Sequence, residues 1–102
     1  MLKLIFFVPE SHKEIVKEAL FKIGAGSLGN YDRCSFEAEG VGQFRPSAEA
    51  DPFLGEGEKL EKVREFKVEM VLKNDLKDKV KDALISNHPY ETPAYEFYAI
   101  ID

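Results

Sequence analysis

The sequence predicts an α+β fold of the ferredoxin-like α/β plait type, with a four-stranded antiparallel sheet and two helices on one face. The first observation is the order of periodic segments along the chain: strand, helix, strand, a long interruption, then strand, helix, strand. The second is length. With 102 residues, the chain can bury one small core, so we expect residues 1–102 to form a single domain.

The first three elements have clear boundary signals. Residues 2–8 are aliphatic and aromatic, which predicts a strand that Pro9 ends. Apolar residues at helical spacing then predict a helix over residues 11–24. Ser11 and Glu14 have the spacing of a capping box, and Gly24 is placed to end the helix in a left-handed conformation.

The second strand is predicted over residues 31–39, where apolar and polar side chains alternate. Residues 43–45 would continue it past a bulge or bend at two glycines. Residues 46–57 contain prolines, glycines and small polar residues, which predicts a long surface loop of the kind that is often functional or mobile. The strand positions expected to face the helices are Cys34, Phe36 and Ala38.

The second half repeats the pattern. Residues 58–72 predict a long strand, and Asn74 or Asp75 would cap a second helix that Pro89 ends. Residues 94–101 predict the last strand. The expected inward positions of these strands are Phe66, Val68, Met70 and Leu72, then Tyr95, Phe97, Ala99 and Ile101.

The sheet face opposite the helices is expected to be partly apolar. An apolar patch of this kind usually marks an interface, so we expect a homo-oligomer that packs through the open face. The apolar residues predicted on that face are Ile5, Phe7, Val71, Tyr98 and Ile100.

Composition excludes several classes of function. The chain has 19 acidic and 14 basic residues and a formal charge of -5, with no basic stretch for a nucleic acid. A single cysteine, Cys34, fits a reducing compartment and is expected in the core rather than as a nucleophile. The early apolar run, residues 4–8, is too short for a signal peptide or a membrane span. We therefore expect a cytoplasmic protein that binds neither membranes nor nucleic acids.

Three motifs could carry chemistry. Residues 24–29 match the dinucleotide pattern G-x-G-x-x-G, but a helix precedes them and a strand follows, which favours a helix cap and a tight turn. His88 and Glu91 lie three residues apart in a proline-stiffened loop and could bind a divalent metal ion or move protons, or His88 could cap its helix. Arg45 opens the long loop and could bind an anion or a carboxylate of a neighbouring subunit.

Three blocks of the chain, residues 24–46, 51–70 and 88–98, resemble one family closely. They are similar to the domain inserted in bacterial Nif-three-like proteins, also called the type 2 GTP cyclohydrolase or dinuclear-metal-centre family. That domain resembles the copper-tolerance protein CutA and the regulatory PII proteins, and this chain resembles a stand-alone version of it. The resemblance implies the same fold and a trimer with sheets packed inward. It does not imply the family's metal site, whose ligands lie in flanking halves that this sequence does not contain.

Two functional hypotheses follow. The first is a non-enzymatic, oligomeric regulatory or ligand-binding module that holds a small anion, a nucleotide or a metal ion in a cleft between subunits. The alternatives are a small enzyme in which His88 is the general acid or base, oriented by Glu91 or Asp32, and a structural domain that binds a partner protein. In the first hypothesis the blocks near residues 24–31 and 88–91 meet at one end of the domain. Its predicted ligand-binding residues are Gly26, Asn30, Tyr31, Asp32, Phe44, Arg45 and Tyr90, with His88 and Glu91 as metal ligands.

Overall fold

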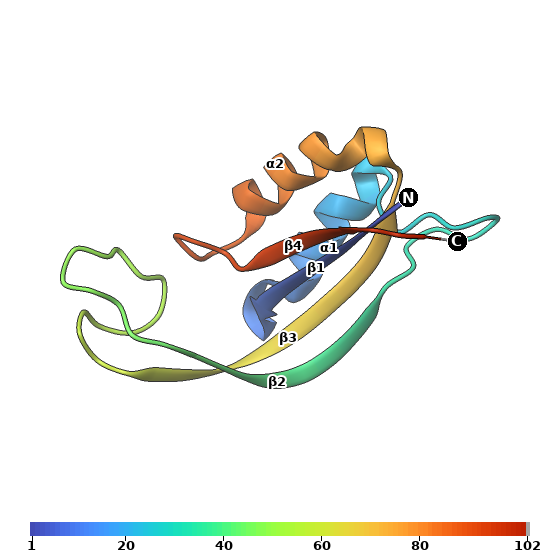
Figure 1. Ribbon diagram of the computed structural model, residues 1–102. Helices are drawn as coiled ribbons and strands as arrows, with labels where there is room; N and C mark the ends of the chain where they lie inside the picture. The colour runs from blue at the N-terminus through green and yellow to red at the C-terminus, as the bar shows by residue number, and fades with distance from the viewer. Residues whose placement is uncertain (102) are drawn as a thin grey trace.

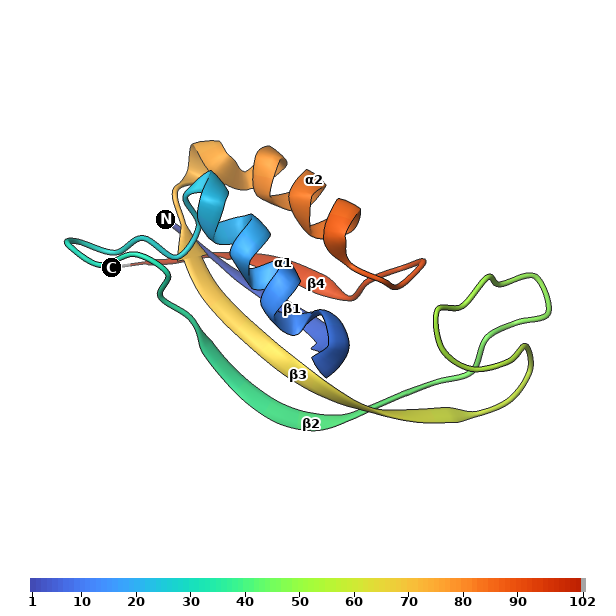
Figure 2. The same cartoon turned by 180° about the vertical axis from the view of Figure 1, so that it is seen from behind.

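The computed structural model describes residues 1–101 and shows a four-stranded sheet in the order β2-β3-β1-β4, with both helices over one face (Figures 1 and 2). Every neighbouring pair of strands is antiparallel. This confirms the predicted α+β plait. The elements are β1 (Leu2–Pro9), α1 (Glu10–Ile23), β2 (Phe36–Phe44), β3 (Glu61–Leu72), the short 3₁₀ helix η1 (Asn74–Leu76), α2 (Lys77–Asn87) and β4 (Tyr95–Ala99).

The core lies between the helices and the two central strands. Alternate residues of β1 and β3 point toward the helices and are buried, which confirms the predicted inward positions of β3. None of the helices within residues 1–101 is both long and apolar enough to cross a membrane. The buried apolar residues are Leu4, Phe6, Val8, Val16, Leu20, Ala25, Phe66, Val68, Met70, Leu72, Val80 and Leu84.

The helix starts differ from the sequence prediction. The chain passes from β1 into α1 without a loop, so Pro9 is the N-cap residue and Ser11 makes no capping hydrogen bond. Pro9 suits this position because it has no N–H to leave unsatisfied. The end of α1 is as predicted: Gly24 is left-handed, with φ of 115°, and its N–H bonds to the carbonyls of Leu20 and Phe21.

The second helix is also entered without a side-chain cap. Asn74 and Asp75 belong to η1, a single 3₁₀ turn that leads directly into α2, so neither side chain caps the helix as predicted. The last strand is shorter than predicted. Tyr95 and Phe97 pack against the core, but Ile101 lies beyond the strand and is 97% exposed, so the prediction that it faces inward was wrong.

The strand β2 begins five residues later than predicted and presents the opposite face. It runs without a bulge from Phe36 to Phe44, and the pairing of Glu37 with Val68 places Glu37 on the helix side. Phe36 therefore points to the open face and is 66% exposed. Because β2 is an edge strand that the helices only partly cover, a carboxylate can occupy the inward position as long as cations meet it.

Those cations come from α1. The Nζ atoms of Lys13 and Lys17 lie 2.5 and 2.9 Å from the two carboxylate oxygens of Glu37. The lysine side chains are only 14% and 12% exposed, and that of Glu37 is 29% exposed. The hydrogen bond from Lys13, followed by the one from Lys17, lowers the pKa of Glu37 below its ordinary value. This half-buried pair joins α1 to the edge strand.

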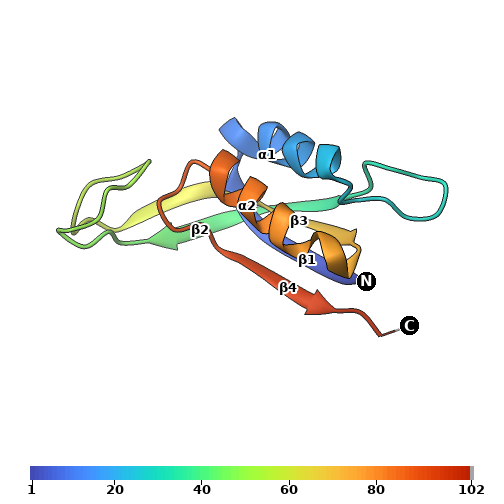
Figure 3. The ribbon, with the colours of Figure 1, turned by 90° about the horizontal axis from the view of Figure 1, so that it is seen from above.

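The topology separates two groups of loops. The helix α1 runs back along β1 and ends near the start of that strand, where Gly26 N–H bonds to Val71 O. The helix α2 runs the other way and ends near Phe7, to which His88 bonds. The β2–β3 hairpin continues past Pro9 as an arm, residues 41–64, at this second end (Figure 3). The molecule is accordingly elongated, 46 × 25 × 24 Å.

Glu37→Gln is expected to lower the free energy of unfolding by about 1 kcal/mol at neutral pH, because the lysines lose a half-buried partner. The pKa of Glu37 is lowered in the folded state, so this stabilisation is present above the unfolded pKa and is lost as pH falls through the folded value. Urea unfolding of both proteins between neutral and acidic pH measures the difference.

The matched control is Glu14→Gln, which removes a 72% exposed carboxylate near the same lysines and should change stability little. A pH-independent difference between wild type and Glu37→Gln would contradict the assignment of this ion pair.

Candidate functional site

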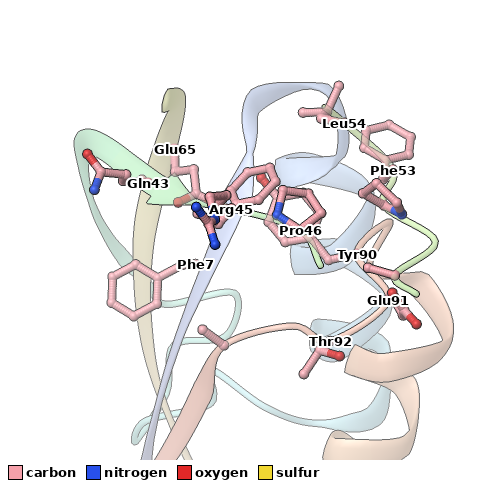
Figure 4. A pocket seen from close by; sticks show the side chains of 15 residues that line it. Phe7, Gln43, Arg45, Pro46, Phe53, Leu54, Glu65, Tyr90, Glu91 and Thr92 are labelled. Carbon is pink, nitrogen blue, oxygen red and sulfur yellow. The ribbon is translucent and has the colours of Figure 1, made fainter. Parts of the chain in front are cut away.

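A cavity of about 430 Å³ lies where the arm leaves the body of the domain (Figure 4). We call it the arm pocket. Its walls come from the end of β1, from both strands of the arm, from the loop 46–57 and from the loop that follows α2. It is lined by Phe7, Gly42, Gln43, Phe44, Arg45, Pro46, Ala50, Pro52, Phe53, Leu54, Glu65, Tyr90, Glu91, Thr92 and Ala94.

Hydrogen bonds hold the loop 46–57 over this pocket. Glu58 N–H bonds to Pro46 O at 2.6 Å and closes the loop at its base. Asp51 N–H donates to Glu91 Oε1 at 2.9 Å, which ties the loop to the segment after α2. Pro46 is buried. This long loop, which the sequence predicts to be functional or mobile, is therefore anchored at its base and near its middle.

Aromatic rings form much of the wall. The ring centroids of Phe44 and Phe53 lie 6.3 and 6.4 Å from that of Tyr90. Phe53 also meets the ring of His12 on α1 edge to face, at 5.3 Å. Offset and edge-to-face pairs at these distances are favourable. The tip of the loop is thus packed toward both the pocket and the first helix.

His88 positions the segment beneath the pocket. It is 7% exposed, its Nε2 lies 2.6 Å from Phe7 O, and its Nδ1 accepts the N–H of Tyr90 at 3.1 Å. Because a carbonyl can only accept, Nε2 carries the proton and the ring is neutral. Burial lowers the pKa of His88 below its usual value. The residue is also the C-cap of α2, where its N–H, not its ring, bonds to Leu84 O.

This geometry leaves His88 no free nitrogen. To bind a metal ion or exchange a proton, the ring would have to break one of two hydrogen bonds. Glu91 is exposed and already accepts the Asp51 N–H. No group of three or more His, Cys, Asp and Glu side chains within residues 1–101 is arranged to hold a metal ion. The predicted pair His88 and Glu91 stays a prediction, and these contacts do not support it.

The Tyr90 hydroxyl is the one buried side-chain polar atom without a hydrogen-bond partner among the described residues. Burial raises the pKa of Tyr90, and a polar contact with the Glu65 carboxylate, followed by the negative charge of that group, raises it further. Glu65 lies across Gly42: a Cβ at position 42 would collide with its carboxylate. A glycine on β2 thus gives this carboxylate its place at the pocket.

Arg45 lies on the arm side of the pocket, near Glu65 (Figure 4). Its side chain is exposed. Neither Arg45 nor Glu65 forms an ion pair with any residue of 1–101. Three of the predicted binding residues, Phe44, Arg45 and Tyr90, therefore line one cavity.

The other predicted binding residues lie at the opposite end of the domain. Residues 26–35 form a projecting turn in which Leu28 and Tyr31 pair as an isolated bridge, and Tyr31 is 76% exposed. Arg33 holds the turn to α1 through Glu18, with Nη2 and Oε1 2.8 Å apart. The expectation that this turn meets the segment 88–91 within one subunit was wrong, because α1 and α2 end at opposite ends of the sheet. This placement also excludes Asp32 of the same subunit as an orienting group for His88.

Sequence reasoning missed two residues of the arm pocket that matter most. Phe7 was predicted on the open face, where alternation with buried Phe6 and Val8 does place it, but was not proposed as part of a site, and Glu65 was not proposed at all. Alternation in β3 places Glu65 opposite to buried Phe66. What the alternation cannot show is the cross-strand register that sets Glu65 beside Gly40 and near Gly42.

Comparison with known proteins identifies relatives of this chain in sequence and in structure. No family model matches it. It is 44% identical over 100 residues to a GTP cyclohydrolase 1 type 2 homolog of Halalkalibacterium halodurans, a match that covers 98% of this chain and 27% of the relative. The chain therefore spans about a quarter of the length of the curated relatives it matches. A Bacillus cereus protein related to NIF3 superposes with a TM-score of 0.83 and 40% identity, over 99% of this chain and 26% of that one.

Smaller proteins share the fold over most of their length. CutA1 from Pyrococcus horikoshii has a TM-score of 0.69 at 22% identity, and the match covers all of this chain and 85% of CutA1. The PII-like protein CutA from Nostoc has a TM-score of 0.63 at 12% identity, over 98% and 81% of the two chains. This chain has the fold of CutA and is similar in sequence and structure to about a quarter of the length of NIF3-related proteins. At these identities the CutA structures show the fold of the domain alone.

The buried imidazole of His88 is expected to titrate below the ordinary histidine pKa of about 6.5. The unfolded chain then binds a proton that the folded one resists, so stability falls as pH decreases from about 6.5 toward the folded pKa. An NMR pH titration of the ring protons, assigned with a His12→Gln variant, measures it directly. A midpoint at or above 6.5 would show that the ring is not held neutral by burial.

Proposed function

We propose that this domain is a non-enzymatic, oligomeric ligand-binding module that self-associates through its open sheet face and holds a small molecule in the arm pocket. The observation that carries the binding role is the buried, unpartnered Tyr90 hydroxyl beside Glu65, inside a cavity of about 430 Å³ walled by aromatic rings. A buried polar atom without a partner costs free energy that a ligand can recover. Mostly apolar cavities of this size with a few polar groups are typical of ligand sites.

The open face supports self-association. The reversed orientation of β2 adds Phe36 to the predicted patch, near Val71 and separated from Ile5 by Glu69, and Tyr98 is 50% exposed. Lys3, Lys67, Glu69 and Glu96 are interspersed on the same face, so a second copy could meet apolar groups and charges of both signs. The trimer implied by the resemblance to CutA and PII remains our expected stoichiometry.

The names of the relatives point to two kinds of chemistry. The long relatives are named as cyclohydrolase homologs, and one structural neighbour is a periplasmic divalent cation tolerance protein. The domain spans about a quarter of the first group, and it shares only the fold with the second. The sequence-based candidates, a small anion, a nucleotide or a metal ion, are therefore to be tested directly rather than assigned from names.

An enzymatic role for His88 is less well supported. A general acid or base needs a nitrogen that can reach substrate, and both ring nitrogens are engaged within the protein. The alternative of a partner-binding domain finds some support in the projecting turn, where Leu28 is 57% exposed and Tyr31 more so.

Native mass spectrometry is expected to show an oligomer of the intact chain, and Phe36→Glu is expected to give mainly monomer, because it places a second carboxylate opposite Glu69 on the open face. Leu28→Glu is the matched control, since it adds the same charge at the projecting turn. A wild-type monomer, or an oligomer that Phe36→Glu leaves intact, would remove the open face from the proposal.

Ligand binding is expected to raise the melting temperature. At a hundredfold excess over Kd the folded state gains about 2.7 kcal/mol, which is on the order of 10 °C for a domain of this size. The screen contains ATP, GTP, Mn²⁺, Zn²⁺, phosphate and the free amino acids. Ala50→Trp fills the pocket and should abolish the shift, whereas Ser47→Trp, in the same loop but outside the lining, should retain it. An unchanged melting temperature with every compound in the screen would contradict the binding role.

A further inference from the structure

The charges in the arm pocket identify the class of ligand; this inference rests on the proposed function. Of the two carboxylates in the lining, Glu91 accepts the Asp51 N–H, whereas the Glu65 carboxylate forms no ion pair with any residue of 1–101 and has a polar contact only with the Tyr90 hydroxyl. Glu65 is half-buried and kept at the pocket by the space above Gly42. Arg45 lies near this carboxylate but forms no ion pair with it, so Glu65 is free to accept a ligand ammonium group.

Arg45 indicates that the ligand also carries a negative group. This guanidinium lines the same cavity, is exposed, and has no carboxylate partner among residues 1–101. A guanidinium binds a carboxylate through two parallel hydrogen bonds, which makes it selective for planar anions. Figure 4 shows Arg45 next to Glu65, with Phe53 farther from both of them. One cation and one free anion therefore face a largely aromatic space.

The charges of the pocket lining argue against two other classes of ligand. A nucleoside triphosphate would bring several negative charges to a cavity that has one arginine and two carboxylates, Glu65 and Glu91, so repulsion would oppose it. A simple amine would satisfy Glu65 but would meet Arg45 unpaired. A ligand with a positive and a negative group close to each other could pair with both Glu65 and Arg45. An apolar group on the same ligand could contact the aromatic wall.

The geometry points to a free α-amino acid with an aromatic or branched aliphatic side chain as the ligand of the arm pocket. Its ammonium group pairs with Glu65 and its carboxylate with Arg45. Its side chain lies among the rings of Phe44, Phe53 and Tyr90, and the buried Tyr90 hydroxyl gains a polar partner from the ligand. A pocket of about 430 Å³ is large enough for such a molecule.

Isothermal titration calorimetry of the full chain with three probes tests this assignment. The probes are L-phenylalanine, phenethylamine, which lacks the carboxylate, and 3-phenylpropionate, which lacks the ammonium group. L-phenylalanine should bind roughly tenfold or more tightly than either fragment, since each fragment loses a charge-assisted hydrogen bond. Similar affinities for all three, or no detectable binding of L-phenylalanine, would overturn the assignment.

Variants identify which side chain recognises each charge. Glu65→Gln should weaken L-phenylalanine roughly tenfold and leave 3-phenylpropionate unchanged, and Arg45→Gln should weaken L-phenylalanine equally and leave phenethylamine unchanged. Gly42→Ala keeps the charge but displaces the Glu65 carboxylate, so it should act as Glu65→Gln does. Asp82→Asn and Lys79→Gln, exposed on α2, are the controls and should have no effect. Uniform loss or no loss with both pocket variants would contradict the assigned roles.

The two levels of the proposal fail separately. If L-phenylalanine does not bind but another compound stabilises wild type and not Ala50→Trp, the amino-acid assignment is wrong and the binding module stands. If neither amino acids nor any other compound in the thermal screen gives a shift, both are wrong.

Discussion

The antiparallel pairing of β1 with β3 is the constraint on which the rest of the structure depends. It runs from Leu2 opposite Leu72 to Pro9 opposite Glu65, and it buries alternate residues of both strands beneath the helices. It must stop at Pro9, which has no N–H to extend the ladder and where the chain enters α1. Four residues of β3, 61–64, remain beyond that point and pair only with β2. The end of this pairing therefore creates the arm.

The arm pocket follows from that early end. The β2–β3 hairpin extends beyond the end of β1, so a recess forms between the arm and the rest of the domain. The segment after α2 lies in the same region and forms part of its wall. His88 fixes this segment from below through Phe7 O, and Asp51 fixes the loop from above through Glu91. Each of these bonds joins residues far apart in sequence. The pocket is thus shaped by hydrogen bonds between side chains and backbone, while Arg45 and Glu65 form no ion pair within residues 1–101.

Periodicity in the sequence predicted the plait because the core strands and both helices bury one regular face. It predicted Gly24 correctly, since a left-handed residue after a helix favours glycine. It failed on β2 because an edge strand is only half covered, so Glu37 could turn inward to meet two lysines and Phe36 outward. It also failed on Ser11, because no loop separates β1 from α1.

The candidate site was predictable only in part. Phe44, Arg45 and Tyr90 stand out beside loop signals, and all three line the arm pocket. Glu65 depends on strand register and on a glycine across the sheet, which local sequence does not encode. The turn at residues 26–35 and the segment after α2 both follow a helix, so the sequence suggested that they lie together. In the structure they lie at opposite ends of the sheet.

The strands β1 and β4 end side by side, with Leu2 opposite Ala99 and Met1 O accepting the N–H of Ile100 at 3.1 Å. Both chain ends therefore emerge together, away from the arm (Figure 1). A longer polypeptide can carry such a unit as an excursion from one of its surface loops, with only short connecting segments and no stretching of its own backbone. The arm and its pocket would then lie most of the 46 Å length of the unit away from the polypeptide that carries it, and would stay accessible to solvent.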